Sequence, residues 1–427
     1  MNRRDFIGYG ASLGAAAFVG PWRSASAADR RADFTWGGWT AGHFQIHGIY
    51  TGVGESLYLV FPDGTSALID CGDWPAARRG KLAVPVLPNG EKHAGEWVGR
   101  YIDRVNPRKG EVDYMIVSHF HNDHTGIASW AEPKPEGFPD NGGCARSGFA
   151  LVAEHVKFMR AIDRGWPDYN QPLPIDDDGA PELAHMRSVY AWLQKRDGLH
   201  IERFRLGATD QIRQLHDESR YPDFRVTNIC GNGLVFRRDG TVDDTLYLRY
   251  LRGKRKCENA MSIGHVFRYG RFSFFTAGDF SDHLWAGQGK PIYYIEDALA
   301  DAVGPVQVAK INHHGYKSMS PRLVSALRAR VWMACVWDQL HVMPECAARL
   351  SDRTLYPGDR AIVPGYFSPE RYVTEKGKPW LRDVPPETGE GVHVVVDVPP
   401  GGATYTVSLI GASDETMTVR SVMHFKS

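Results

Sequence analysis

The sequence predicts an α/β fold, and three observations carry that prediction. Short apolar runs of strand length recur along the chain, for example at 57–61, 66–69 and 112–117. Two longer segments, 149–164 and 181–196, have the pattern of helices. Several strand-like runs end directly at histidine or aspartate, where a loop would leave a sheet. With 427 residues, of which 43% are hydrophobic, the chain can form one large domain with insertions or two modest domains.

The first expected elements form a β-hairpin. Its strands, 57–61 and 66–69, are joined by the turn triplet Pro62-Asp63-Gly64. A buried strand is expected next at 112–117, and it ends at Ser118-His119. The loop that begins at Ser118-His119 therefore leaves the carboxyl end of a strand.

A partly helical insertion that roofs the site is expected over 131–220. Residues 131–148 are rich in proline, glycine and charge, which is typical of a loop. A helix is expected over 149–164. A second helix is expected over 181–196, because it has proline at its first residue and glycine two residues past its end.

From residue 225 onward the pattern changes to strands. The main domain is assigned to 33–385 and a C-terminal β segment to 386–427. The expected elements are strands at 246–251, 262–269, 272–277, 306–311 and 331–336, a helix at 321–330, and strands near 392–398, 404–410 and 416–424.

The N-terminus has the pattern of an export signal over residues 1–27. Arg3-Arg4 precede a weakly apolar run, and Ala25-Ser26-Ala27 forms a small-residue cleavage pattern. The paired arginines resemble the twin-arginine type, although Asn2 replaces the usual Ser or Thr. A membrane anchor is the alternative, but the run is shorter than the roughly 20 apolar residues a span needs. We expect a periplasmic or secreted protein without a membrane span after cleavage.

Composition narrows the partners. The 50 basic and 50 acidic residues cancel, so no global field attracts nucleic acid or an anionic membrane. Binding of nucleic acid stays possible only through a local patch, and a small-molecule substrate is the expected partner. The six cysteines form no CxxC pair, which argues against a zinc ribbon or a thioredoxin-like motif, and no disulfide is predicted.

The most informative segment is His119-Phe120-His121-Asn122-Asp123-His124, directly after an apolar strand. Imidazole and carboxylate are the donors that zinc and similar ions prefer. In an extended turn, side chains at alternating positions point the same way, so His119 and His121 are directed toward one ion. The adjacent pair Asp123 and His124 is directed toward a second ion. One loop thus supplies ligands for two metal ions. The alternative, a polar cap on a strand end, is disfavoured by three imidazoles and a carboxylate within six residues.

At these residues the sequence resembles the metallo-β-lactamase superfamily, whose first motif, His-x-His-x-Asp-His, is matched completely. The resemblance implies a four-layer αββα sandwich, here with the helical insertion. It also implies that His119 and His121 bind one ion and that Asp123 and His124 bind the other. Two divalent ions are expected, with zinc as the default and manganese or iron as alternatives.

Two later strand ends extend the resemblance. The strand 272–277 is followed by Gly278-Asp279, where the superfamily carries an aspartate that bridges both ions. The strand 306–311 leads to His313-His314-Gly315. One of these two histidines is expected to bind the second ion, and the other to support a ligand or face the substrate.

Over 50–130 and 225–350 the chain looks most similar to ComEC-type extracellular hydrolase domains and choline-phosphate esterases. The matching features are the turn Gly52-Val53-Gly54-Glu55-Ser56, the Pro-Asp-Gly hairpin, the segment 68–72, a Glu-Asn pair, Gly-Asp and His-His-Gly. This similarity implies a phosphoester or phosphodiester substrate.

Two positions depart from the family pattern. Glu258 stands where the third motif normally has a histidine, so either its carboxylate binds metal or the site keeps a more open position for substrate or water. This absence counts against lactamase, glyoxalase or lactonase activity. Tyr316 replaces the serine that often follows His-His-Gly, which weakens the transfer of phosphodiester specificity.

Two further features are candidates for substrate handling. A basic run before Glu258, at 249–256, either attracts anions to the site or forms a solvated hairpin tip. His341 either donates to a substrate oxygen and takes part in proton transfer, or packs structurally. Asp123 and His341 are therefore the catalytic candidates.

The expected function is that of an exported metal-dependent hydrolase that uses a metal-bridged hydroxide on a phosphoester or phosphodiester. The alternative substrates are carbonyl compounds: lactones, thioesters or β-lactams. A metal-binding protein without catalysis is the third interpretation. Metal analysis with a substrate screen discriminates among the three.

Overall fold

The structure is a computed structural model that describes residues 34–74, 80–127, 144–170, 174, 179–245, 258–281 and 294–427. Three sequence predictions lie outside the described residues. They are the export signal, the strand at 246–251 and the basic run at 249–256.

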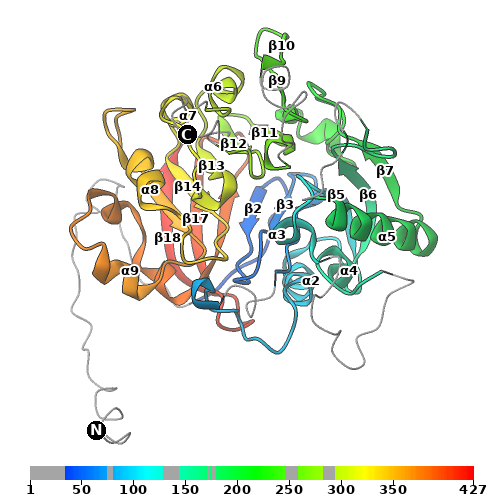
Figure 1. Cartoon of the computed structure of the whole chain (residues 1–427), viewed down its shortest axis with the longest axis horizontal. Coiled ribbons are helices and arrows are strands. Elements are labelled where there is room, and N and C mark those ends of the chain that lie inside the picture. The colour runs from blue at the N-terminus through cyan, green and yellow to red at the C-terminus, as the bar shows by residue number, and fades with distance from the viewer. Residues whose placement is uncertain are drawn as a thin grey trace, which may run out of the picture.

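The described chain forms two large mixed sheets that face each other (Figure 1). The first has the order β1-β18-β17-β16-β2-β3-β4-β5-β6-β7 and the second β10-β9-β8-β11-β12-β13-β14-β15. Strands of the first sheet are β1 Phe34–Thr35, β2 Phe44–Gly48, β3 Leu57–Val60, β4 Ser66–Ile69, β5 Glu111–Ile116, β6 Lys157–Asp163, β7 His200–Arg203, β16 Val392–Val398, β17 Thr404–Gly411 and β18 Thr418–Lys426. Strands of the second are β8 Phe224–Gly231, β9 Leu234–Phe236, β10 Val242–Asp243, β11 Gly264–Tyr269, β12 Phe272–Thr276, β13 Val308–Lys310, β14 Val331–Ala334 and β15 Ala361–Pro364.

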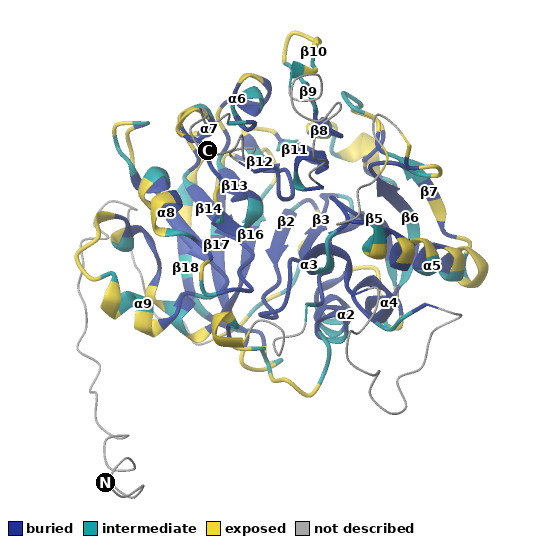
Figure 2. Ribbon diagram, in the orientation of Figure 1, coloured by how far each residue is buried: buried dark blue, intermediate teal, exposed yellow. Residues whose placement is uncertain are grey.

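Side-chain alternation along the strands separates the layers. In β3, Leu57 and Leu59 belong to the core between the sheets, while Tyr58 and Val60 face the helices on the outside. In β14, Val331 likewise points inward and Trp332 outward. The central strands are therefore buried on both faces, as the dark ribbons of Figure 2 show. The result is a four-layer αββα sandwich.

Helices cover the outer face of each sheet. Over the first sheet lie α2 and α5, together with the short α4, and over the second lie α6, α7 and α8. In α2 the residues at 94, 97, 98, 101, 102 and 105 are buried, a spacing that places them on one helical face. The helices are α2 Ala94–Val105, α3 Asn122–Thr125, α4 Phe149–Val152, α5 Ala180–Asp197, α6 Asp297–Val303, α7 Pro321–Leu327, α8 Pro344–Ser351 and α9 Pro369–Thr374.

Most expected elements are confirmed within a few residues, and one is wrong. The predicted helix at 149–164 is instead the single turn α4 followed by strand β6. Strand β6 is parallel to β5 and to β7, so it finds hydrogen-bond partners that local sequence does not reveal.

The described part of the segment 131–220 is consequently not a separate insertion, because it contributes β6 and β7 to the first sheet and packs α5 against that sheet. Of the predicted roof, α5 places Glu182 in the lining of the cavity described below. The C-terminal segment is also central, because β16 pairs with β2 in the middle of the first sheet. Among the described residues, no helix combines the length and the apolar composition required to cross a bilayer.

Candidate metal centre and active site

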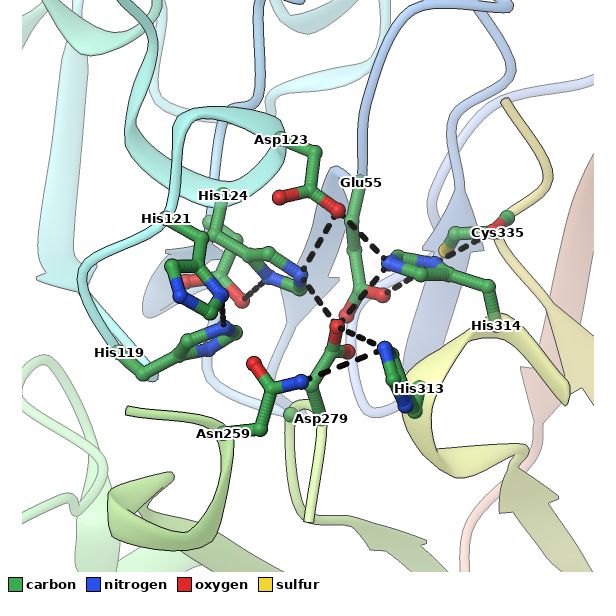
Figure 3. Close-up of polar contacts among 12 residues, drawn as sticks. Glu55, His119, His121, Asp123, His124, Asn259, Asp279, His313, His314 and Cys335 are labelled. Atoms are coloured by element: carbon green, nitrogen blue, oxygen red, sulfur yellow. Dashed lines mark hydrogen bonds and ion pairs between the residues drawn. The ribbon is translucent and has the colours of Figure 1, made fainter. Parts of the chain in front are cut away.

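The predicted site residues follow strands that run parallel to one another. Strands β4 and β5 are parallel neighbours, as are β12, β13 and β14. Because the carboxyl ends of parallel strands meet at one edge of a sheet, the loops after them are close together. Because the two sheets face each other, the 119–124 loop lies against Asp279 and the 313–314 turn (Figure 3).

Four of these side chains converge on one point, which we call the Asp–His cluster: Asp123, His124, Asp279 and His314. His124 Nε2 lies 3.2 Å from Asp279 Oδ2 and 3.5 Å from Asp123 Oδ2. His314 Nε2 lies 3.3 Å and 3.1 Å from the same two oxygens. The side chains are almost completely buried.

These spacings fit a metal ion. Ligands about 2.0–2.1 Å from a tetrahedral ion lie roughly 3.3 Å from one another, close to the four nitrogen–oxygen distances in the Asp–His cluster. His124 Nδ1 lies 2.8 Å from Asp70 Oδ2, and His314 Nδ1 lies 2.8 Å from the carbonyl oxygen of Cys335. If each Nδ1 carries the proton, each Nε2 presents a lone pair to two carboxylates, an arrangement that a cation stabilises.

The electrostatics of the metal-free cluster agree with its need for a cation. Burial lowers the pKa of His314, but the carboxylates of Asp279 and Asp123 outweigh this effect and raise it to about 9. Burial opposes ionisation of Asp279, yet His124 and His314 hold its pKa well below the usual range. A proton on the imidazoles thus fills the electrostatic role that a metal ion would fill.

Asp70 positions the 118–124 loop. Besides its contact with His124, its carboxylate accepts hydrogen bonds from the backbone amide and the hydroxyl of Ser118, at 2.8 Å and 2.6 Å. The loop approaches this strand end closely, since a Cβ on Gly72 would lie 1.8 Å from the carbonyl oxygen of Asp123. Glycine is therefore required at position 72.

Glu55 and Lys310 lie behind the Asp–His cluster and were not among the predicted site residues. Lys310 Nζ lies 2.8 Å from Glu55 Oε2 and donates to the carbonyl oxygen of Gly278 at 2.7 Å. Both side chains are fully buried. The ligand atoms of Glu55, His124, Asp279 and His314 all lie within 4.8 Å of one another. The Gly-x-Gly-Glu-Ser turn carried the signal for Glu55, but sequence alone did not pair it with Lys310.

The second group of candidate ligands contains His119 and His121. His119 Nε2 lies 3.1 Å from His121 Nδ1, again a spacing suited to two ligands of one ion. Ser118 Oγ lies 3.0 Å from His119 Nδ1. His313 faces this side, and its Nε2 lies 3.3 Å from Asn259 Nδ2. Of the adjacent histidines, His314 thus joins the Asp–His cluster and His313 does not.

The assignment of Glu258 as a metal ligand is wrong in this structure. Its two carboxylate oxygens form hydrogen bonds of 2.7 Å with Nε and Nη2 of Arg164, and Oε1 also accepts from the Phe120 amide at 3.2 Å. Arg164 and Glu258 are each 1% exposed, so water does not compete for the pair. Glu258 instead fixes the backbone between His119 and His121. The residue that reaches the histidines is its neighbour Asn259 (Figure 3).

A cavity of about 390 Å³ opens above both groups. One wall is aromatic, because the rings of Trp74 and Trp337 lie 4.9 Å apart and that of Trp337 lies 4.7 Å from that of His341. The cavity is lined by Trp74, His121, Asn122, Asp123, Glu182, Asn259, Asp279, His313, Tyr316, Trp337, Asp338, Leu340 and His341. His341 stacks on His314 with ring centroids 4.9 Å apart, and burial holds its pKa well below the ordinary value.

The backbone is strained at His313 and His314. Their φ values are 46° and 53°, in the left-handed region that residues other than glycine and asparagine rarely adopt. Such conformations persist only where surrounding structure imposes them, and they concentrate at functional sites.

Comparisons with known proteins give a family match over one segment of the chain and a similarity to a solved structure. Residues 50–131 match the family described as the metallo-beta-lactamase superfamily, a segment that includes the complete 119–124 loop. The structure is similar to the crystal structure of Zn(2+)-bound PqqB from Methylobacterium extorquens, at 11% identity over 68% of this chain and 88% of that chain, with a TM-score of 0.28. The comparison with curated proteins finds no match.

The matched segment and the two facing sheets together define a metallo-β-lactamase fold. Proteins of this superfamily are generally metal-dependent hydrolases. The buried histidines and carboxylates of this chain provide donors suited to a divalent ion.

Proposed function

We propose that the protein is an exported hydrolase that depends on two divalent metal ions, with zinc as the default, and acts on a phosphoester or phosphodiester. The observation that carries the proposal is the convergence of two sets of buried metal-ligand side chains at the floor of one cavity. Divalent ions held there would supply Lewis acidity and lower the pKa of water.

Different residues of the site would have different roles in this reaction. The Asp–His cluster would hold one ion, and His119 and His121 would hold the other, with Asp279 between them. His341 lines the cavity beside His314 and, as a neutral imidazole, would donate a hydrogen bond to a substrate oxygen rather than act as a strong acid. Trp74 and Trp337 would contact the leaving group.

The phosphoester assignment rests on the motif similarity to ComEC-type domains and choline-phosphate esterases. A carbonyl substrate is the second candidate, and one observation favours it. Among the described residues that line the cavity there is no arginine or lysine, whereas Glu182 and Asp338 are present. Phosphate recognition would therefore depend on the metal ions themselves.

A substrate screen on metal-loaded protein tests the proposal. Phosphodiesters, phosphomonoesters, lactones, thioesters and β-lactams are offered to wild type, to Asp123→Ala and to Asp239→Ala, which replaces an exposed aspartate in the turn between β9 and β10, outside the cavity lining. We expect phosphodiester turnover that Asp123→Ala loses and Asp239→Ala keeps. Turnover of carbonyl substrates alone would select the second candidate. If a metal-loaded sample hydrolyses none of these substrates, the remaining interpretation is a metal-binding protein without catalysis.

The export proposal has a separate test. The full chain is expressed in a bacterium with and without replacement of Arg3-Arg4 by lysines. We expect the native form in the periplasm or medium, with its first residue near position 28, and cytoplasmic retention of the variant. Retention of both forms at full length would overturn export without affecting the hydrolase proposal.

A further inference from the structure

We propose that the side-chain oxygen of Asn259 is a ligand of the ion held by His119 and His121, and that this ion is consequently bound more weakly than the ion in the Asp–His cluster. The inference rests on the proposed two-ion function and adds a ligand and an order of loading. It concerns a residue that the sequence motifs did not select.

A chain of hydrogen bonds fixes the orientation of the Asn259 amide. Ser281 Oγ donates to the carbonyl oxygen of Asp279 at 3.0 Å. Its single proton is thus used, so Ser281 Oγ accepts from His313 Nδ1, also at 3.0 Å. His313 then carries its proton on Nδ1 and presents a lone pair at Nε2. That lone pair accepts from Asn259 Nδ2 at 3.3 Å.

The amide nitrogen of Asn259 therefore faces His313, and its oxygen must face the other way. Figure 3 shows that oxygen directed toward the imidazoles of His119 and His121. Within the described part of the chain, no hydrogen-bond donor reaches Asn259 Oδ1, although this atom is buried. A buried carbonyl oxygen without a donor costs about 1–3 kcal/mol, and a cation beside it removes that cost.

The neighbouring residues hold Asn259 at this place. Glu258 begins the short helix Asn259–Met261 and is anchored by Arg164. The same Glu258 carboxylate accepts from the Phe120 amide, between the two histidines. The position of Asn259 is therefore coupled to that of His119 and His121 through one buried ion pair.

A carboxamide oxygen is a weaker ligand for zinc than imidazole, thiolate or carboxylate, and carbonyl oxygen suits harder ions such as manganese. The Asp–His cluster has two carboxylates and two imidazoles. The Asn259 side has two imidazoles, one neutral oxygen and a share in Asp279. We therefore expect one tight and one weak class of metal site.

Equilibrium metal binding tests the inference without reference to turnover. The metal-stripped full chain is titrated with Zn2+ against a chromophoric chelator, and cobalt-loaded samples are recorded in the visible range. The proteins are wild type, Asn259→Ala, the isosteric Asn259→Asp, and Asn89→Ala as a control on an exposed asparagine outside the cavity lining. Circular dichroism confirms the folding of each variant.

Wild type should show two classes of site. Asn259→Ala should weaken the weaker class by about tenfold or more and leave the tight class and the Asn89→Ala control unchanged. Asn259→Asp should strengthen the weaker class and alter its cobalt spectrum, because a charged oxygen replaces a neutral one. If Asn259 only positions His313 through Nδ2, Asn259→Asp loses that donor and weakens the site, and the inference is overturned.

Two other outcomes separate this inference from the proposed function. Two equal classes, unchanged by both Asn259 variants, would overturn the role of Asn259 and leave the hydrolase proposal standing. The absence of any specific metal binding in wild type would overturn both.

Discussion

The Asp–His cluster and the group formed by His119, His121 and Asn259 lie side by side but are built differently. In the cluster, both histidines have their outer nitrogens held by Asp70 and by the Cys335 carbonyl, and the side chains are almost completely buried. On the Asn259 side, His121 and Asn259 line the cavity and are only partly buried. The Asp–His cluster is therefore the more completely preorganised half, whereas the other half combines a buried His119, held by Ser118, with two residues that face the cavity.

The largest effect is expected from removing Asp279, the carboxylate that the proposed function places between the two ions. Asp279→Ala should lower metal affinity by about 100- to 1,000-fold, since a site worth about 10–16 kcal/mol is divided among four ligands. Turnover should fall with metal content. Metal analysis after dialysis measures the change, with Asp239→Ala as the control. If the Asp279→Ala protein retains both ions, the proposed difference between the two halves is contradicted, because metal binding by the Asp–His cluster would then not depend on the Asp279 carboxylate.

The next largest effect concerns the scaffold beneath the open half. Glu258→Ala leaves Arg164 as an unpaired buried charge, and we expect a loss of about 3–5 kcal/mol in the free energy of unfolding. Urea denaturation measures it. Glu415→Ala provides the matched control, because its ion pair with Arg100 is partly exposed and should contribute about 1 kcal/mol or less.

Metal content separates the two possible roles of Glu258. Folded Glu258→Ala protein should still bind the tight ion with wild-type affinity. A loss of the tight ion without a loss of stability would mean that the carboxylate binds metal after all, and would reverse the correction made from the structure.

The pH dependence of stability sharpens the comparison further. In the metal-free protein the pKa of His314 is about 9, above its ordinary value of 6.5. Its contribution to folding is fully present below pH 6.5 and is lost as the pH rises through 9. Metal replaces the proton, so the metal-loaded protein keeps this contribution.

The gap in melting temperature between metal-loaded and metal-free protein should therefore widen from pH 6.5 to pH 9. Scanning calorimetry at constant ionic strength measures the gap, and His314→Asn should reduce its pH dependence. A gap that is constant or narrows with pH would contradict a raised pKa at His314.

Prediction from sequence succeeded where the cause is local and failed where it is not. The proximity of the 119–124 loop, Asp279 and the His-His-Gly turn was predicted from the sequence because polar residues follow several strand ends, while their role as metal ligands stays a prediction. The three C-terminal strands were found from alternation, but the position of β16 in the middle of the first sheet depends on pairing across more than 300 residues, as between Val394 and Gly48. Glu258 was misassigned because its partner, Arg164, lies 94 positions away and follows a strand that was expected to be a helix.

The buried pair behind the cluster should have a smaller effect than the ligands themselves. Glu55→Gln removes the charge that Lys310 contacts, and it should weaken the tight ion by about 10- to 100-fold, the range for groups that support metal ligands. Competitive titration measures the change. In a Lys310→Met background the same substitution should cost less, because the two side chains interact. Equal costs in both backgrounds would show that Glu55 acts on the ion directly.

The smallest effect is expected at the aromatic wall, where Trp337 packs against the rings of His341 and His314 and supplies no ligand atom itself. Trp337→Ala removes apolar surface beside the leaving group, so KM should rise by about tenfold while kcat changes little. Trp192→Ala, on α5 and outside the cavity lining, is the matched control. A fall in kcat with KM unchanged would mean that Trp337 acts by holding the His314 ring, which would assign it to the preorganised half of the site.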